Sequence, residues 1–205
     1  MERRKYLFPI YNIFHPIDSV DEMKWYGKGS YISSLVCVFL FFISNIIVKV
    51  GSGFAYSTAS GTYGVFEIFI ITFGVFLLGV ISNILLCTLM DGEGKTKEIC
   101  CLISYSLIIL TASNIVHTIL TNVLQLELII FIQIIDVIFY IWFFACLFLG
   151  LKTAHNFTFF KTVQNIVFTI IAMILVSFLI LLLFSLFQQV ASFVYVVYCE
   201  LVFRM

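Results

Sequence analysis

The chain contains few charged residues and only two prolines, Pro9 and Pro16. Charged side chains make up 11% of its 205 residues and hydrophobic ones 62%, and the mean hydropathy is +1.15. Soluble globular domains carry about 25% charged residues. This composition therefore excludes an ordinary soluble domain and indicates that lipid surrounds most of the protein surface.

The sequence also lacks the motifs of several common enzyme classes. It has no Walker loop, dinucleotide fingerprint, H-E-x-x-H or G-x-S-x-G sequence. The segment 91–96 ends in Gly-Lys-Thr, but its glycine spacing does not match a phosphate-binding loop, and a turn between two helices explains it better. We therefore expect a protein that is not an enzyme, with no cofactor and no nucleic-acid partner.

None of the six cysteines belongs to a C-x-x-C pair. Five of them lie inside or at the edges of apolar stretches, where free thiols usually act as small packing residues. We expect neither a disulfide nor a metal site. Lipid attachment at Cys100 and Cys101 is an alternative that the sequence leaves open.

What the chain does have is five long apolar stretches. A helix needs roughly 20 consecutive apolar residues to cross a bilayer, and the stretches reach that length at 31–50, 65–90, 99–124, 128–151 and 163–187. They lack the alternation of barrel strands, so all should be helices. The predicted fold is all-α, a polytopic membrane helix bundle with five transmembrane helices. Its predicted parts are a cytoplasmic juxtamembrane segment, 1–29, a membrane domain, 30–187, and a tail, 188–205.

Lys and Arg residues are distributed unevenly between the two sides of such a bundle. Nine fall in the N-terminal segment and in the second-to-third and fourth-to-fifth connections, against two, Lys49 and Arg204, on the opposite side. The positive-inside rule then places the N-terminus in the cytoplasm and the C-terminus outside. The tail mixes apolar and polar residues and is too short for another crossing, so we expect an amphipathic helix at the outer interface.

The N-terminal segment combines basic and aromatic residues. Arg3, Arg4 and Lys5 are followed by several large apolar side chains, the last of them Phe14. Basic residues beside aromatic ones ahead of a membrane span favour attachment to an anionic leaflet, at about 1 kcal/mol per cation. Docking of a cytoplasmic partner is the alternative, and the two are compatible.

A few polar residues lie inside the predicted spans. Counted from the turn at Glu127, Asp136 lies roughly 13 Å into the membrane at about 1.5 Å per residue, and Asn114 and His117 reach a similar depth on the preceding span. Their i, i+3 spacing places Asn114 and His117 on one helix face. We predict an intramembrane polar cluster of these three residues. It serves either as hydrogen bonding that fixes helix packing, the favoured interpretation, or as a proton or substrate pathway.

Three polar blocks occur in order along the connecting segments. The first is His15-Pro16-Ile17-Asp18 with residues 21–24 and 28–30, the second is 91–98 with 104–107, and the third is 150–152 with His155 and Lys161. Glu200 and Arg204 follow near the C-terminus. Together with five spans, these blocks resemble the Yip family of Ypt/Rab-GTPase-interacting-like membrane proteins, in its bacterial branch. The Asp-Leu-Tyr-Gly-Pro sequence of eukaryotic members is absent, so no Rab-binding role is carried over.

The resemblance implies a non-enzymatic integral membrane scaffold, or an accessory subunit of a membrane transport assembly, in a bacterial cytoplasmic membrane. Its partners would be membrane lipids and other membrane proteins, among them ABC-transporter components. The expected partner-binding residues all fall on the predicted cytoplasmic face: His15, Asp18, Lys24, Lys28, Asp91, Glu93, Lys95, His155 and Lys161. The alternatives are a transporter or channel in its own right and, third, a membrane-embedded enzyme that uses His117 and Asp136 as an acid–base pair.

Overall fold

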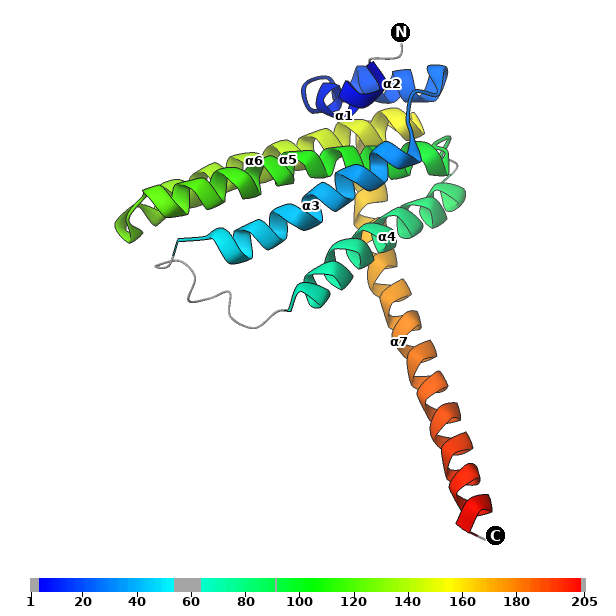
Figure 1. Cartoon of the computed structure of the whole chain (residues 1–205). Helices are drawn as coiled ribbons and strands as arrows, with labels where there is room; N and C mark the ends of the chain where they lie inside the picture. Colours follow the sequence, from blue (N-terminus) through cyan, green and yellow to red (C-terminus); the bar gives the residue numbers. More distant parts are fainter. Residues whose placement is uncertain (1–3, 54–63, 91, 204–205) are drawn as a thin grey trace.

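The computed structural model describes residues 4–53, 64–90 and 92–203, and this part of the chain is helical without any strand. Two short helices come first, and five long ones follow (Figure 1). Their bounds are α1 Arg4–Phe14, α2 Pro16–Tyr26, α3 Tyr31–Gly51, α4 Val65–Leu89, α5 Thr96–Val123, α6 Ile129–His155 and α7 Phe159–Phe203, with a 3-10 turn, η2, at Leu126–Leu128.

The five long helices are all long and apolar enough to cross a membrane. Their starts lie within about four residues of the predicted ones, and so do the ends of α3 to α6. The all-α membrane bundle predicted from the sequence is therefore confirmed, and the protein is an integral membrane protein.

The central helix of the bundle is α5, which packs against α3 on one side and α6 on the other (Figure 1). Its side chains Ile99, Leu102 and Tyr105 are at most 1% exposed. Gly150 on α6 lies so close to Leu102 that an added Cβ would sit 2.1 Å from a Leu102 methyl carbon. Close packing of α5 on α6 thus depends on this glycine.

The N-terminal helices α1 and α2 pack against α5 and α6 near the start of α3 (Figure 1). Phe8, Val20 and Met23 are buried in the same core cluster as Leu102 and Tyr105. Proline opens α2, where its missing N–H costs no hydrogen bond, and a glycine in the left-handed conformation ends it. Helices α1 and α2 are therefore packed as part of the folded protein. Leaflet attachment and partner docking both stay predictions for this segment.

The last helix continues through the predicted boundary between the fifth span and the tail. Residues 163–187 and 188–203 belong to one continuous helix, α7, of 45 residues. The stretch contains neither glycine nor proline, so nothing in it interrupts the helix. At about 1.5 Å per residue α7 is roughly 67 Å long, against a hydrocarbon core of about 30 Å. Its C-terminal half runs away from the other helices (Figure 1).

Candidate functional site

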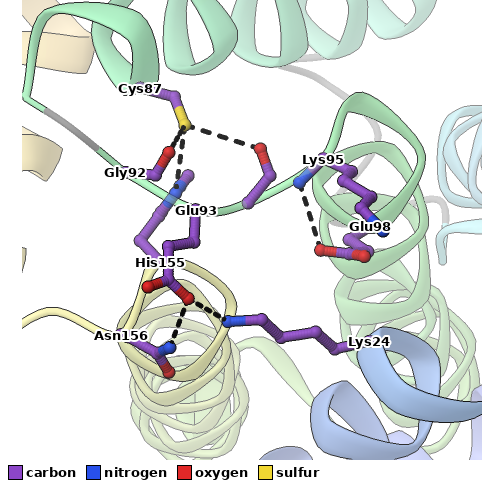
Figure 2. A network of polar contacts seen from close by, with 9 residues as sticks. Lys24, Cys87, Gly92, Glu93, Lys95, Glu98, His155 and Asn156 are labelled. Atoms are coloured by element: carbon purple, nitrogen blue, oxygen red, sulfur yellow. Dashed lines mark hydrogen bonds and ion pairs between the residues drawn. The ribbon is translucent and has the colours of Figure 1, made fainter.

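Helix α2, the connection between α4 and α5 and the end of α6 meet at Glu93, at one end of the bundle (Figure 2). Its carboxylate accepts a hydrogen bond from Lys24 Nζ on α2 at 2.8 Å and one from Asn156 Nδ2, at the end of α6, at 2.6 Å. The ammonium group of Lys24 donates to this carboxylate and thereby lowers the pKa of Glu93. Glu93 thus ties the segment between α4 and α5 to two other elements while its side chain stays 61% exposed.

His155 lies close to this contact as a buried residue, 2% exposed. Its Nε2 lies 3.1 Å from Asn83 Oδ1, and its Nδ1 lies 3.4 Å from Cys87 Sγ. The ring stacks on Phe157 at a centroid distance of 5.0 Å. The ring is enclosed by α4, the connection to α5 and the end of α6, so it is not an exposed part of the predicted partner-binding surface. A role of His155 in partner binding stays a prediction.

Gly92 and Gly94 allow the backbone to pass directly over the His155 ring. An added Cβ would lie 2.8 Å from His155 Nδ1 at Gly92 and 2.7 Å from the same ring at Gly94. The Cys87 thiol lies 3.1 Å from the Gly92 carbonyl oxygen and 3.5 Å from that of Gly94 (Figure 2). The glycines that the sequence assigns to a helix–helix turn are thus required by this close approach.

The remaining predicted residues of this end form local contacts. Lys28 Nζ pairs with Glu22 at 2.7 Å, and His15 Nδ1 lies 3.8 Å from the Asp18 carboxylate, with both of the latter side chains more than half exposed. Lys161 Nζ lies 4.6 Å from the centre of the Phe157 ring. The backbone N–H of Lys95 donates to Glu98 at the start of α5. Asp91 lies outside the described residues.

Two exposed aromatic residues on α2 do not stand out in the sequence. Trp25 is 78% exposed and Tyr26 75% exposed, and Lys28 Nζ lies 5.4 Å from the centre of the Tyr26 ring. A signal in the sequence that could have identified them is their position between two charged residues, Lys24 and Lys28. We call the exposed side chains of this end the α1–α2 face: His15, Asp18, Trp25, Tyr26 and Glu93.

The predicted intramembrane cluster divides into two separate contacts. His117 Nδ1 lies 2.7 Å from Asp136 Oδ2, and Ser113 Oγ donates to the same carboxylate at 3.4 Å. Asn114 points elsewhere, because its Nδ2 donates to Ser44 Oγ at 3.0 Å and Asn45 Oδ1 at 3.2 Å. One contact therefore links α5 to α6 and the other links α5 to α3.

Within the described residues, no group of three or more His, Cys, Asp or Glu side chains is placed to hold a metal ion. The comparison with protein-family models matches residues 11–182, well over half of the chain, to the Yip1 domain. Neither the comparison with curated proteins nor the one with solved structures gives a match.

Proposed function

The chain belongs to the Yip1 domain family, and from that premise we propose that it is a non-enzymatic membrane scaffold or accessory subunit that binds partners through the α1–α2 face. The partner is another membrane protein, with components of ABC transporters as the first candidates. In this proposal the N-terminus and the α1–α2 face lie in the cytoplasm, as the distribution of Lys and Arg predicts. The bacterial cytoplasmic membrane is what the family resemblance implies.

The observation that supports this proposal is the way Glu93 holds three segments together. Lys24 and Asn156 are distant from Glu93 in the sequence, yet both donate hydrogen bonds to its carboxylate, at 2.8 Å and 2.6 Å. The exposed Trp25 and Tyr26 belong to α2, the helix that Lys24 ties to Glu93. Tyrosine and tryptophan are enriched at protein-binding surfaces and often contribute much of the binding energy there.

The experiment that tests this function compares what co-purifies with variants of the full chain in mild detergent. Trp25→Ala removes an exposed aromatic side chain of the α1–α2 face, and we expect it to lower partner recovery about tenfold. Phe203→Ala removes an equally exposed aromatic side chain, 88% exposed at the far end of α7, and should leave recovery unchanged. Equal recovery from both would contradict the proposed function.

The role of Glu93 is tested by reversing charge at either end of the bundle. Glu93→Lys places two ammonium groups beside each other and should release the partner. Glu127→Lys makes the same change at an exposed acid in the turn between α5 and α6 and should not. Combining Glu93→Lys with Lys24→Glu restores the ion pair in reverse, and recovery should return if the pair acts by holding the α1–α2 face in place.

Transport in its own right is the second candidate, since His117 and Asp136 form an ionisable contact inside the spans at 2.7 Å. Reconstituted protein that moves a solute or protons across liposomes without any partner would favour this candidate. Asp136→Asn should then abolish transport, and it should leave partner recovery unchanged under the scaffold proposal.

A further inference from the structure

A cavity lies among the membrane-spanning helices, away from the α1–α2 face. Its volume is about 710 Å³, within the range of about 300–1,000 Å³ typical of small-molecule sites. Residues from α3, α4, α5, α6 and α7 line it, and most of them are apolar. Three of them, Val75, Phe144 and Ile170, are 54%, 63% and 55% exposed, so the cavity opens on the flank of the bundle, where lipid chains lie.

Lys49 is the one charged residue among those lining the cavity. It lies in the last turn of α3, at the opposite end of that helix from α2, and it is partly buried. Within the described part of the chain no acidic side chain pairs with it. Glu67, which lies in the first turn of α4, accepts the Gly64 N–H at 3.0 Å instead. Among these residues, an ammonium group beside apolar walls therefore lacks an anion.

Both asparagines of the cavity wall have partners of their own. Asn83 Nδ2 donates to Thr169 Oγ1 at 3.2 Å, and Asn45 Nδ2 donates to the Phe41 carbonyl oxygen at 3.0 Å. A polar solute would find little to bind along these walls. An apolar chain with an anionic group at one end matches both the walls and the cation.

We propose that this cavity binds an anionic phospholipid of the bilayer, with one acyl chain between α4 and α6 and the headgroup phosphate at Lys49 Nζ. The headgroup then lies at the membrane interface, because Lys49 is at the end of its span. An acyl chain fills apolar space that no side chain of the described residues occupies, and the phosphate supplies the missing anion.

Gly79 offers a direct way to close the site. It lines the cavity, and a Cβ added there meets no atom within 4 Å. Gly74 on the same helix also has open space at its Cβ but does not line the cavity. Gly79→Phe therefore fills the cavity, and Gly74→Phe is its matched control. Gly79→Leu is the smaller variant to use if Gly79→Phe is not produced as folded protein.

The experiment measures lipid binding to the delipidated full chain in detergent by native mass spectrometry, with phosphatidylglycerol and phosphatidylcholine of identical chains as probes. We expect phosphatidylglycerol to bind more tightly. Lys49→Gln should weaken its binding about fivefold, from the roughly 1 kcal/mol of one cation near anionic lipid. It should weaken binding of phosphatidylcholine less, because the choline cation offsets the charge of that phosphate. Lys152→Gln, at an exposed lysine near the end of α6, should change neither.

Gly79→Phe should reduce binding of both lipids, and Gly74→Phe should not. Equal affinity for the two lipids, or unchanged binding by both Gly79 variants, would overturn the proposal. A dimer that forms in the native spectrum and is lost with Gly79→Phe would also overturn it, since a helix of a second copy would then be the occupant. Loss of partner recovery in the Trp25→Ala variant has no bearing on this outcome, because the two sites are separate.

Discussion

His155 and His117, the two histidines inside the bundle, differ in burial and in the kind of partner they contact. His155 is 2% exposed and contacts the amide of Asn83 and the thiol of Cys87. The His117 side chain is 31% exposed and contacts the carboxylate of Asp136, itself 20% exposed. The first is enclosed by neutral partners from several segments, and the second forms one polar contact between two helices. We therefore expect the contribution of each histidine to stability to depend on how deeply it is buried and on how many segments it contacts.

This difference predicts that His155→Leu destabilises the protein more than any other single substitution in these two contacts. The substitution leaves the Asn83 side-chain carbonyl without its His155 partner. It also removes one of the contacts of the Cys87 thiol and the ring that the Gly92–Gly94 backbone packs against. We expect the free energy of unfolding to fall by about 3 kcal/mol, measured by denaturation in mixed micelles. His15→Leu, at an exposed histidine, should stay within about 0.5 kcal/mol of wild type, and an equal loss in both variants would refute this prediction.

The next largest effect is expected from Gly94→Ala. Its Cβ would lie 2.7 Å from the His155 ring, so the ring or the backbone must shift, at a cost of about 1–3 kcal/mol. The control is Gly74→Ala, whose Cβ meets nothing and which should be neutral or stabilising by up to about 1 kcal/mol, since alanine favours helix. Thermal unfolding of both variants measures the difference, and a Gly94→Ala protein as stable as wild type would contradict the close approach.

A smaller effect is expected at the other histidine contact. Asp136→Ala removes the hydrogen-bond partner of His117, and intramembrane contacts of this kind are typically worth under about 2 kcal/mol. We expect the free energy of unfolding to fall by about 1 kcal/mol, and Asp136→Asn should recover part of it because the amide can still bond the ring. If Asp136→Ala lost more free energy of unfolding than His155→Leu in the same mixed-micelle denaturation, the predicted order of the two histidine contacts would be wrong.

The smallest change in stability is expected at the exposed ion pair of Lys24 and Glu93. Glu93→Gln should produce a small loss, since exposed pairs are screened by solvent. Because the pKa of Glu93 is lowered in the folded state, its contribution is present above the pKa of the unfolded chain and disappears as pH falls through the folded-state pKa. Melting temperatures of wild type and Glu93→Gln should therefore converge in acid, and a difference that grows in acid would contradict this assignment.

The helices and the family resemblance could be predicted because they depend on local composition. Apolar runs long enough to cross a bilayer must form helices whatever surrounds them, so α3 to α6 lie close to their predicted positions. The polar residues from Gln188 onward suggest a boundary between the fifth span and a separate tail helix, but α7 continues through it. The stretch has no proline or glycine that would end the helix there. The contact of His117 with Asp136 could be predicted by counting the depth of both residues along adjoining helices. The contact of Asn114 with Ser44 on α3 could not, because it depends on which face of α5 packs against which neighbour.

The sequence by itself determined that this is a five-span helical membrane protein whose polar blocks lie at one end. Only the tertiary structure decided which of those polar residues are buried and which are exposed. Three residues at the same end of the bundle illustrate this. His155 is buried, Glu93 is exposed but bonded to Lys24, and Trp25 is exposed. The cavity beside Gly79 likewise depends on residues from five helices. Such outcomes follow from contacts between residues far apart in the chain, which no local pattern encodes.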